Sequence, residues 1–288
     1  MEILYTILQA IIQGLTEFLP VSSSGHLSLF QHFTGKSGEG ALMFSAVLHL
    51  GTLLAVFICF KDTIIELIKE FFVMVKDIFT GKFKWSTMNG YRRMIVMIFI
   101  STACLLPFYI FKDWFTGIAE DKSIFAEGLC FLYTAAILYM SDKCAKKNKK
   151  EKDITLKDSV TVGFFQGVAL LPGVSRSGST ITAGLFSGFS RPLAVQYAFI
   201  LGTPAILGSC LLEVKDAIAE DAVTVSFGHC VLGFVVAAVV GICAIKMVNW
   251  LLKSDKFKIF AYYTFGLGVV VLIIAFIEMA IGHPITIG

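Results

Sequence analysis

Two stretches of this chain, 153 positions apart, carry the same pattern of glycine and hydroxyl residues. Residues 13–25 read QGLTEFLPVSSSG, and residues 166–178 read QGVALLPGVSRSG. The two align without a gap, and most of the identical positions are glutamine, glycine or serine. Polar residues and glycines are shared by chance less often than leucine or valine. The repeat therefore indicates that the chain consists of two related halves.

The chain around the repeat is mostly apolar. Hydrophobic residues make up 56% of the 288 residues and charged residues 16%, and the mean hydropathy is +0.79. Because soluble domains carry about 25% charged residues, this composition predicts a membrane protein. Six apolar runs have, or nearly have, the roughly 20 residues that a helix needs to cross a bilayer. They lie at 41–60, 94–111, 124–141, 194–214, 228–245 and 259–277. The predicted fold class is an all-α integral membrane protein with six transmembrane helices.

Lysine and arginine are unevenly distributed among the loops between these runs. Segments 61–93 and 142–158 each hold seven, and segment 246–258 holds four. The loops at 112–123 and 215–227 hold two and one. Because cytoplasmic loops carry the excess of basic residues, we expect the three basic segments inside the cell and the other two loops outside. This assignment alternates consistently across all six predicted helices.

Each copy of the repeat is followed by three of the apolar runs. Three is an odd number, so the two halves must cross the membrane in opposite orientations. The repeat segments are too interrupted to cross, so we expect re-entrant helical hairpins at 1–33 and 159–190, one entering from each side. The predicted organisation is a first repeat at 1–141, a basic cytoplasmic linker at 142–158 and a second repeat at 159–288. Irregular backbone inside a bilayer needs protein or a water-filled cavity around it, so the two tips should meet at a shared hydrated site.

The two tips would bring many polar side chains together. The first contributes Glu17, Ser22, Ser23, Ser24 and His26, and the second contributes Ser175, Arg176, Ser177, Ser179 and Thr180. An arginine among hydroxyl groups and helix N-termini is typical of a phosphate site, because guanidinium and free backbone N–H groups match phosphate oxygens. Charges are costly inside a bilayer, so Arg176 and Glu17 are candidates for function. The alternative is that they only pair with each other and hold the hairpins together.

The first tip also suggests hydrolytic chemistry. Ser23 and His26 lie three positions apart, close enough for a hydroxyl–imidazole pair. In hydrolysis of a phosphoanhydride, Arg176 would neutralise the transferred phosphoryl group, and Glu17 could hold a divalent cation or orient His26. The residues leave open whether His26 is the nucleophile, the base or the acid. His49, within the first apolar run, is either a hydrogen-bonded core residue or a group that supports this site.

These motifs resemble those of the undecaprenyl pyrophosphate phosphatase (bacitracin-resistance) family. The similarity rests on QGLTEFLPVSSSGH at 13–26 and PGVSRSGST at 172–180, and it covers the whole chain in length, repeat and order of apolar runs. It implies a bacterial inner-membrane enzyme that removes the terminal phosphate of undecaprenyl pyrophosphate. Such an enzyme regenerates the lipid carrier for cell-wall synthesis and confers resistance to bacitracin. The resemblance also implies a divalent cation, Mg²⁺ or Ca²⁺, and an active site that faces the outer side.

The same resemblance implies roles for particular residues. The residues that match the family's essential positions are Glu17, Ser23, His26 and Arg176, and those expected around the phosphates are Ser22, Ser24, Ser175, Ser177 and Thr180. Glu17 is also the expected metal ligand, with Gln13 as a candidate second ligand. The first position of the family's Glu/Gln-x-x-x-Glu motif is the uncharged Gln13 in this chain. Glu17 would therefore bind the metal without a second carboxylate from this motif. Ser24 stands where threonine is frequent and keeps the hydroxyl.

A second class of function stays open at this stage. Inverted repeats with broken helices also occur in transporters, so the chain could be a small transporter or lipid flippase. Three apolar runs in each half make a thin wall for alternating access, and the polar cluster exceeds what anion transport requires. A purely structural role does not explain the polar repeat. The expected partners are a polyprenyl pyrophosphate lipid and the bilayer, with no nucleic acid, and a homodimer is left open.

Overall fold

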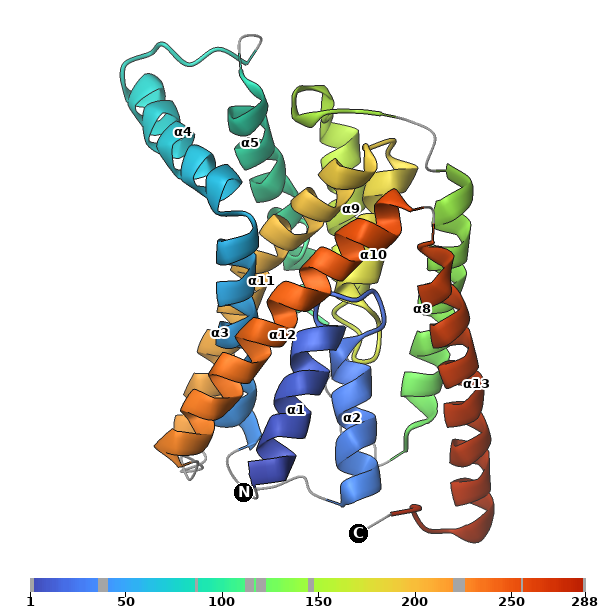
Figure 1. Ribbon diagram of the computed structural model, residues 1–288. Coiled ribbons are helices and arrows are strands. Elements are labelled where there is room, and N and C mark those ends of the chain that lie inside the picture. The colour runs from blue at the N-terminus through green and yellow to red at the C-terminus, as the bar shows by residue number, and fades with distance from the viewer. Residues whose placement is uncertain are drawn as a thin grey trace.

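A computed structural model describes residues 3–35, 41–85, 88–111, 117, 123–144, 148–219, 226–254 and 256–286. The principal helices are α1 (Ile3–Thr16), α2 (Ser23–Thr34), α3 (Ala41–Cys59), α4 (Lys61–Phe79), α5 (Gly90–Ala103), α6 (Leu106–Tyr109), α8 (Phe125–Cys144), α9 (Leu156–Val168), α10 (Arg176–Phe186), α11 (Arg191–Ala219), α12 (Phe227–Lys253) and α13 (Lys258–Ile281). Figure 1 shows their arrangement. Most of the loop at 112–123, residues 220–225 and residues 145–147 of the linker lie outside the described residues.

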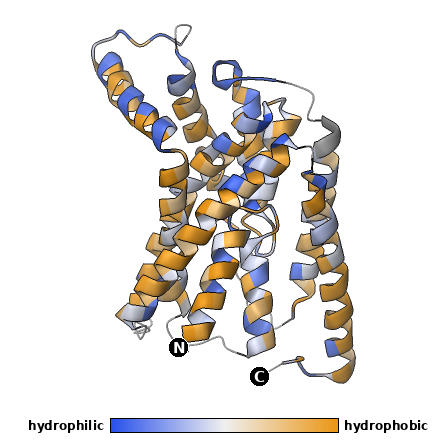
Figure 2. Ribbon diagram, in the orientation of Figure 1, coloured by the Kyte–Doolittle hydropathy of each residue, from blue (hydrophilic) through white to orange (hydrophobic). Residues whose placement is uncertain are grey.

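Five helical segments are long and apolar enough to cross a membrane within the part of the chain that the structure describes. They are α3, the Gly90–Phe108 segment formed by α5 and α6, α11, α12 and α13. The sixth predicted run, 124–141, corresponds to α8, whose apolar part Phe125–Ser141 is shorter than these five. Figure 2 shows that apolar residues predominate along most of the length of the long helices. The chain is an all-helical, multi-pass membrane protein, which confirms the predicted fold class.

Two helical hairpins enter the bundle from opposite ends. The α1–α2 hairpin comes from the end that carries both chain termini, and the α9–α10 hairpin comes from the other end (Figure 1). Their turns contact each other directly. The backbone N–H of Gly173 donates to Ser24 Oγ at 3.1 Å, and Ser177 Oγ donates to the backbone oxygen of Leu19 at 3.1 Å. The two tips therefore meet, as the sequence predicts.

Residues 148–158 of the predicted linker hold the start of the second hairpin in place. Thr155 caps α9: its Oγ1 accepts from the backbone N–H of Asp158, and the Asp158 carboxylate accepts from the backbone N–H of Thr155. Lys149 Nζ also donates to Asp158, at 2.7 Å. This reciprocal capping satisfies N–H groups that a helix start leaves without partners, so α9 begins at Leu156 within the linker segment.

The helices of the two halves are interleaved. α1 and α3 from the first half pack on α12 from the second, and α8 packs on α13. Two glycines bring the backbones into contact with α12. A Cβ on Gly51 would lie 2.5 Å from the backbone oxygen of Phe234, and a Cβ on Gly14 would lie 2.8 Å from that of Ala237. Small residues allow such close approach between membrane helices, so the halves share one core.

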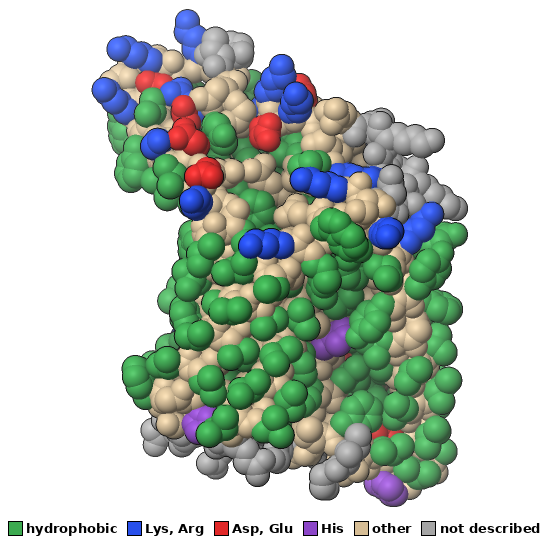
Figure 3. All heavy atoms as spheres, in the orientation of Figure 1, with side chains coloured by type: hydrophobic (Ala, Val, Ile, Leu, Met, Phe, Trp, Pro, Cys, Tyr) green, Lys and Arg blue, Asp and Glu red, His purple; other side chains and the backbone are tan. Residues whose placement is uncertain are grey.

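Lysine and arginine gather at the end of the molecule that carries α4 (Figure 3). α4 has alternating polar and apolar faces (Figure 2) and leans away from the bundle. Arg92 of α5 anchors it, because its guanidinium donates to Glu70 at 2.6 Å and to Asp77 at 2.7 Å. The hydrogen bond from Arg92 holds the pKa of Glu70 below its ordinary value. This end of the molecule is therefore both basic and cross-linked by ion pairs.

Candidate active site

A serine from each copy of the repeat caps the second helix of its hairpin. Ser22 Oγ accepts from the backbone N–H of Gly25 at 3.2 Å, and Ser175 Oγ accepts from that of Gly178 at 3.0 Å. The two caps are equivalent positions of the repeat. They place the N-terminus of α2 and the N-terminus of α10 at the meeting point of the tips. Helix N-termini attract anions through their free N–H groups and dipole, so each half places one helix end of this kind at the meeting point.

The first tip holds a strained residue. Ser22 has φ 74°, and it is the only non-glycine residue with positive φ among those the structure describes. Such a conformation costs on the order of 1–3 kcal/mol in a residue that carries a side chain. In the second tip, Gly173 takes a positive φ of 91° without that cost. The strained turn at Ser22 directly precedes Ser23 and fixes where α2 begins.

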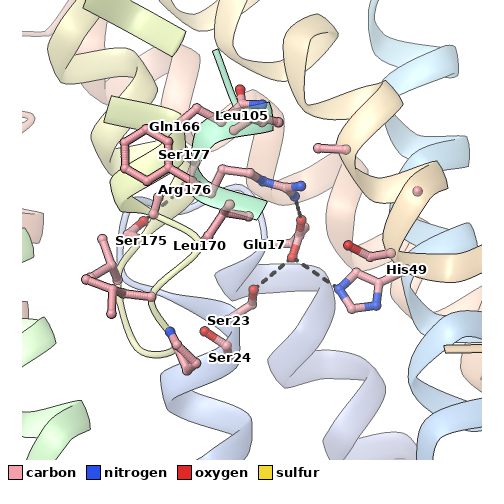
Figure 4. Close-up of a pocket in the computed structure, with 18 of the residues that line it drawn as sticks. Glu17, Ser23, Ser24, His49, Leu105, Gln166, Leu170, Ser175, Arg176 and Ser177 are labelled. Carbon is pink, nitrogen blue, oxygen red and sulfur yellow. Dashed lines mark hydrogen bonds and ion pairs between the residues drawn. The ribbon is translucent and has the colours of Figure 1, made fainter. Parts of the chain in front are cut away.

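The carboxylate of Glu17 lies at the centre of the cluster (Figure 4). Its Oε1 accepts from Nη2 of Arg176, which comes from the opposite hairpin. Its Oε2 accepts from Ser23 Oγ at 2.8 Å and from Gln13 Nε2 at 3.0 Å. The Glu17 side chain is 2% exposed and that of Arg176 is 27% exposed. A buried charge needs a counter-charge and hydrogen-bond donors, and Glu17 receives both from residues of the two tips.

A histidine and a second carboxylate extend this cluster toward α11. His49 Nε2 lies 4.0 Å from Glu17 Oε2, and its Nδ1 lies 3.6 Å from Oε2 of Glu213. His49 Nδ1 also lies 3.1 Å from the backbone oxygen of Ser45, so both roles that the sequence left open are compatible with the structure: a hydrogen-bonded core residue that also lies beside Glu17. The sequence analysis did not include Glu213 among the site residues. The feature that could have indicated it is a carboxylate close to the end of an apolar run.

A cavity of about 580 Å³ opens beside the cluster. Its lining includes six of the predicted site residues: Glu17, Ser23, Ser24, Ser175, Arg176 and Ser177. Much of the remaining wall is apolar and includes Leu105, Phe108, Leu170 and Pro204. A ligand in this cavity would meet charge and hydroxyl groups on one side and hydrocarbon on the other. That combination fits an amphiphile with a phosphorylated end.

Two of the other predicted residues bond to their own hairpins and do not belong to the cavity lining among the described residues. Ser22 acts as the cap of α2, and Thr180 Oγ1 donates to the backbone oxygen of Arg176 at 2.9 Å. Gln13, which is outside the cavity lining, donates a hydrogen bond to the Glu17 carboxylate through its Nε2. These side chains shape the turns and orient the residues that face the cavity.

His26 also points elsewhere. Its Nδ1 lies 2.7 Å from the backbone oxygen of Ser22, and its Nε2 lies 2.8 Å from the hydroxyl of Tyr263. The His26 ring stacks on Tyr263, with ring centroids 5.8 Å apart. The hydroxyl of Ser23 donates to Glu17 instead of pairing with His26. The hydroxyl–imidazole pair that the spacing allowed is thus absent, because Tyr263 of α13 and the Ser22 carbonyl engage both ring nitrogens.

Over residues 6–270 the chain matches the family model described as Bacitracin resistance protein BacA. The chain belongs to this family. An undecaprenyl-diphosphatase of Alkaliphilus metalliredigens (strain QYMF) is 38% identical over 271 residues, which are 93% of this chain and 96% of that protein. Undecaprenyl-diphosphatase 3 of Bacillus cereus is 38% identical over 269 residues, again 93% and 96% of the two chains. An undecaprenyl-diphosphatase of Methanosphaera stadtmanae is 35% identical over 281 residues, 96% and 99%.

Membership of the BacA family confirms the resemblance that the two motifs carry. Both motifs, at 13–26 and 172–180, lie inside the matched range. In this BacA-family chain the motifs supply the capping serines, the Glu17–Arg176 pair and most of the hydroxyl groups of the cavity. The family match and the geometry therefore point to the same part of the molecule.

Proposed function

We propose that this protein hydrolyses undecaprenyl pyrophosphate to undecaprenyl phosphate and inorganic phosphate. The relatives named undecaprenyl-diphosphatase cover more than nine tenths of the chain. The observation that carries the proposal is the pair of the buried Glu17 and the partly exposed Arg176 at the polar side of a cavity within an apolar helical bundle. A pyrophosphate on a long hydrocarbon chain matches both sides of that cavity. The reaction recycles the lipid carrier of cell-wall synthesis and confers resistance to bacitracin.

Ser23 is the nucleophile that the geometry supports. Its hydroxyl already donates to Oε2 of Glu17 at 2.8 Å, the arrangement in which a carboxylate acts as general base. Ser23 Oγ attacks the terminal phosphorus while its proton passes to Glu17. The bond to the bridging oxygen breaks, and undecaprenyl phosphate leaves. Water then cleaves the phosphoserine and releases inorganic phosphate. His26, held on Tyr263, is the alternative nucleophile.

Arg176 has two roles in this scheme. In the free protein it neutralises Glu17, and with substrate its guanidinium meets the transferred phosphoryl oxygens, whose geometry it matches. Phosphate oxygens compete with Glu17 for the same N–H groups. Substrate binding would therefore release the carboxylate from its ion pair at the moment when it has to accept the proton of Ser23.

A divalent cation, Mg²⁺ or Ca²⁺, fits this site only together with the substrate. Among the described residues no group of three or more His, Cys, Asp or Glu side chains could hold a metal ion. The protein donors are the Glu17 carboxylate, which lines the cavity, and behind it Oε1 of Gln13, which is buried and has no hydrogen-bond partner among the described residues. Mg²⁺ commonly binds one or two carboxylates plus substrate phosphates, and this donor set suits such binding. A cation here would supply neutralisation of phosphate charge.

The basic end of the molecule supports an orientation in the membrane. Because cytoplasmic segments carry excess lysine and arginine, we place the end that carries α4 in the cytoplasm and the chain termini outside. The protein would then lie in the bacterial inner membrane with its active site facing the outer side. One chain supplies both hairpins, and a homodimer is a further expectation. The mass of the purified protein in detergent distinguishes a homodimer from a monomer.

The proposal is tested by phosphate release from a long-chain isoprenyl pyrophosphate by the purified protein in detergent, with Mg²⁺ or Ca²⁺ and then with a chelator. We expect Arg176→Ala to lower kcat/KM by about 10²–10³-fold, the effect of removing a donor that stabilises transition-state charge. Arg176→Lys keeps the charge without the planar fork and should recover only part of the activity. Near-wild-type activity of a folded Arg176→Ala protein would rule out this mechanism.

A further inference from the structure

The side chain of Gln166 in α9 is buried without a partner. It is 2% exposed, and neither its Nε2 nor its Oε1 hydrogen-bonds to any residue that the structure describes. The same side chain lines the cavity beside Arg176 (Figure 4). Buried amide groups in folded proteins almost always have partners, so an unpartnered one that borders a cavity points to a ligand.

The internal repeat explains why this amide has no partner. Gln166 is the counterpart of Gln13, which donates to Glu17 at 3.0 Å. The counterpart of Glu17 in the second half is Leu170, a hydrocarbon side chain that also lines the cavity. The second half has thus kept the glutamine and lacks the carboxylate that would accept its hydrogen bond. Its N–H groups remain available to a molecule in the cavity.

A second unpartnered group lines the same cavity. Thr102 Oγ1, from α5, is buried and has no hydrogen-bond partner among the described residues. α5 and α9 are in backbone contact, because a Cβ on Gly163 would lie 2.6 Å from the backbone oxygen of Ser101. The hydroxyls of Ser23 and Ser177, by contrast, already have partners. Unused hydrogen-bonding capacity is therefore available on the α5 and α9 side of the cavity.

We propose that Gln166 is a substrate-binding residue whose Nε2 donates to a non-bridging oxygen of the pyrophosphate group, with Thr102 Oγ1 as a second donor. The inference rests on the proposed function and extends it to these two residues. Arg176 supplies the positive charge that attracts the pyrophosphate. The neutral amide of Gln166 adds a directional hydrogen bond, which orients the pyrophosphate without adding charge to the site. An amide N–H donates well to an anionic oxygen, and such bonds are stronger than those between neutral groups.

The test compares Gln166→Leu with Gln196→Leu. Gln196 of α11 donates to Thr63 at 2.6 Å and does not line the cavity. We measure the melting temperature with and without inorganic pyrophosphate, and the kinetics with a long-chain isoprenyl pyrophosphate. In Gln166→Leu the unliganded melting temperature should stay the same or rise, because an unpaired buried amide is removed. The stabilisation by pyrophosphate should be smaller than in the wild type at the same pyrophosphate concentration, and KM should rise about tenfold or more with little change in kcat.

Gln196→Leu should do the opposite: it lowers the unliganded melting temperature and leaves KM and the pyrophosphate response unchanged. If Gln166→Leu lowers the unliganded melting temperature and leaves KM unchanged, the amide is structural and the inference is wrong. Gln166→Met, which keeps the length of the side chain, is the second variant if the leucine protein does not fold. Wild-type protein that binds pyrophosphate through Gln166 but releases no phosphate would contradict the proposed function alone.

Discussion

At the scale of single residues, Glu17 accepts hydrogen bonds from both hairpins, and its position explains why the two tips stay together. Arg176, Ser23 and Gln13 all donate to one carboxylate that is 2% exposed. Removing one member of such a buried pair leaves an uncompensated charge, with a loss of about 3–5 kcal/mol. The pair therefore contributes to stability as well as to chemistry, and the two effects have to be separated by experiment.

Ser23→Ala removes the proposed nucleophile and leaves the Glu17–Arg176 pair in place. We expect kcat to fall by at least about 10²-fold, since Ser23 is the hydroxyl that donates to Glu17 among the residues that the structure describes. Ser141→Ala is the matched control: Ser141 is a buried serine of α8 that donates to the backbone oxygen of Leu138, and its loss should leave kcat unchanged. The measurement is phosphate release. If Ser23→Ala keeps its rate within about tenfold, His26 becomes the nucleophile, and acid-labile phosphohistidine should be trapped.

Gln13→Glu supplies the second carboxylate that this chain lacks. Two adjacent buried carboxylates repel each other, so the variant should melt at a lower temperature than the wild type when a chelator is present. Added Mg²⁺ or Ca²⁺ should raise its melting temperature by more than that of the wild type, because two carboxylates bind a hard cation better than one. If the cation raises the melting temperatures of the two proteins equally, position 13 does not contribute to cation binding.

The sequence predicts part of this site and not the rest, for a physical reason. The Glu17–Arg176 contact follows from inverted topology and from the cost of charge in a bilayer, both of which are readable from the chain. The partner of His26 does not follow. The hydroxyl of Tyr263 lies 237 positions away and competes with Ser23 for the ring. Local spacing limits which residues can meet, and side-chain rotamers set by distant helices decide which do.

At the scale of helices, close backbone contacts through glycine hold α12 against α1 and α3. A methyl group on Gly51 would lie 2.5 Å from a backbone oxygen of α12, a distance that real Cβ atoms do not show. The neighbouring atom is backbone, so it cannot move aside as a flexible side chain could. The position of α3 relative to α12, and with it the position of His49, depends on this contact.

Gly51→Ala should therefore destabilise the protein by about 1–3 kcal/mol, the cost of overpacking a well-packed core. Gly266→Ala is the control, because a Cβ at Gly266 of α13 meets no atom within 4 Å. In a helix interior that change should be neutral or slightly stabilising, since alanine favours helix more than glycine does. The free energies of unfolding of the two variants are measured in mixed micelles with an increasing fraction of denaturing detergent. Equal stability of the two variants would contradict the close contact between α3 and α12.

The attachment of α4 should weaken in acid. Arg92 holds the pKa of Glu70 below its ordinary value of 4.5, so Glu70 binds its proton more weakly when α4 is docked than when it is free. The stabilisation is therefore fully present above pH 4.5 and is lost as the pH falls through the lowered pKa. Hydrogen exchange of α4 amides, corrected for intrinsic rates, should show less protection at about pH 3.5 than at about pH 6. In the Glu70→Gln variant, the α4 amides should be weakly protected from exchange at both pH values.

Helix positions were easier to predict than helix ends. Five apolar runs correspond to long helices because burial of hydrocarbon in the bilayer decides their existence. The start of α9 at Leu156 depends instead on a local cap, in which Thr155 and Asp158 exchange hydrogen bonds. Thr155 and Asp158 have the spacing of a capping pair, but this spacing alone does not decide that a helix begins there. The basic character of residues 142–158 concealed it.

At the scale of the whole molecule, the two halves are related by sequence but do not form separate cores. α1 and α3 pack on α12, and α8 packs on α13, so each half buries its apolar surface against the other. The repeat at 13–25 and 166–178 gives the relation between the halves, while the interleaving comes from tertiary packing that no local pattern encodes. A half without its partner would expose the glycine-lined faces that α12 covers.

Two separately expressed fragments, 1–147 and 148–288, should test this interdependence. We expect neither fragment alone to remain monodisperse in detergent, and we expect the two expressed together to copurify and to release phosphate. The chain break at 147–148 follows the last described residue of α8, Cys144, and precedes η2 (Glu151–Asp153). Copurification measured with an affinity tag on one fragment is the readout. A first fragment that is stable and active by itself would contradict the shared site.

The origin of Glu17 and Arg176 in opposite hairpins has a consequence during protein synthesis. The ribosome makes the acidic member of the pair first and the arginine 159 residues later. Until α9 and α10 have inserted, the nascent chain carries an incomplete catalytic apparatus and an unneutralised carboxylate. The enzyme therefore cannot act on lipid before its second hairpin has been made and inserted, and a defect in the insertion of that hairpin would yield an inactive protein.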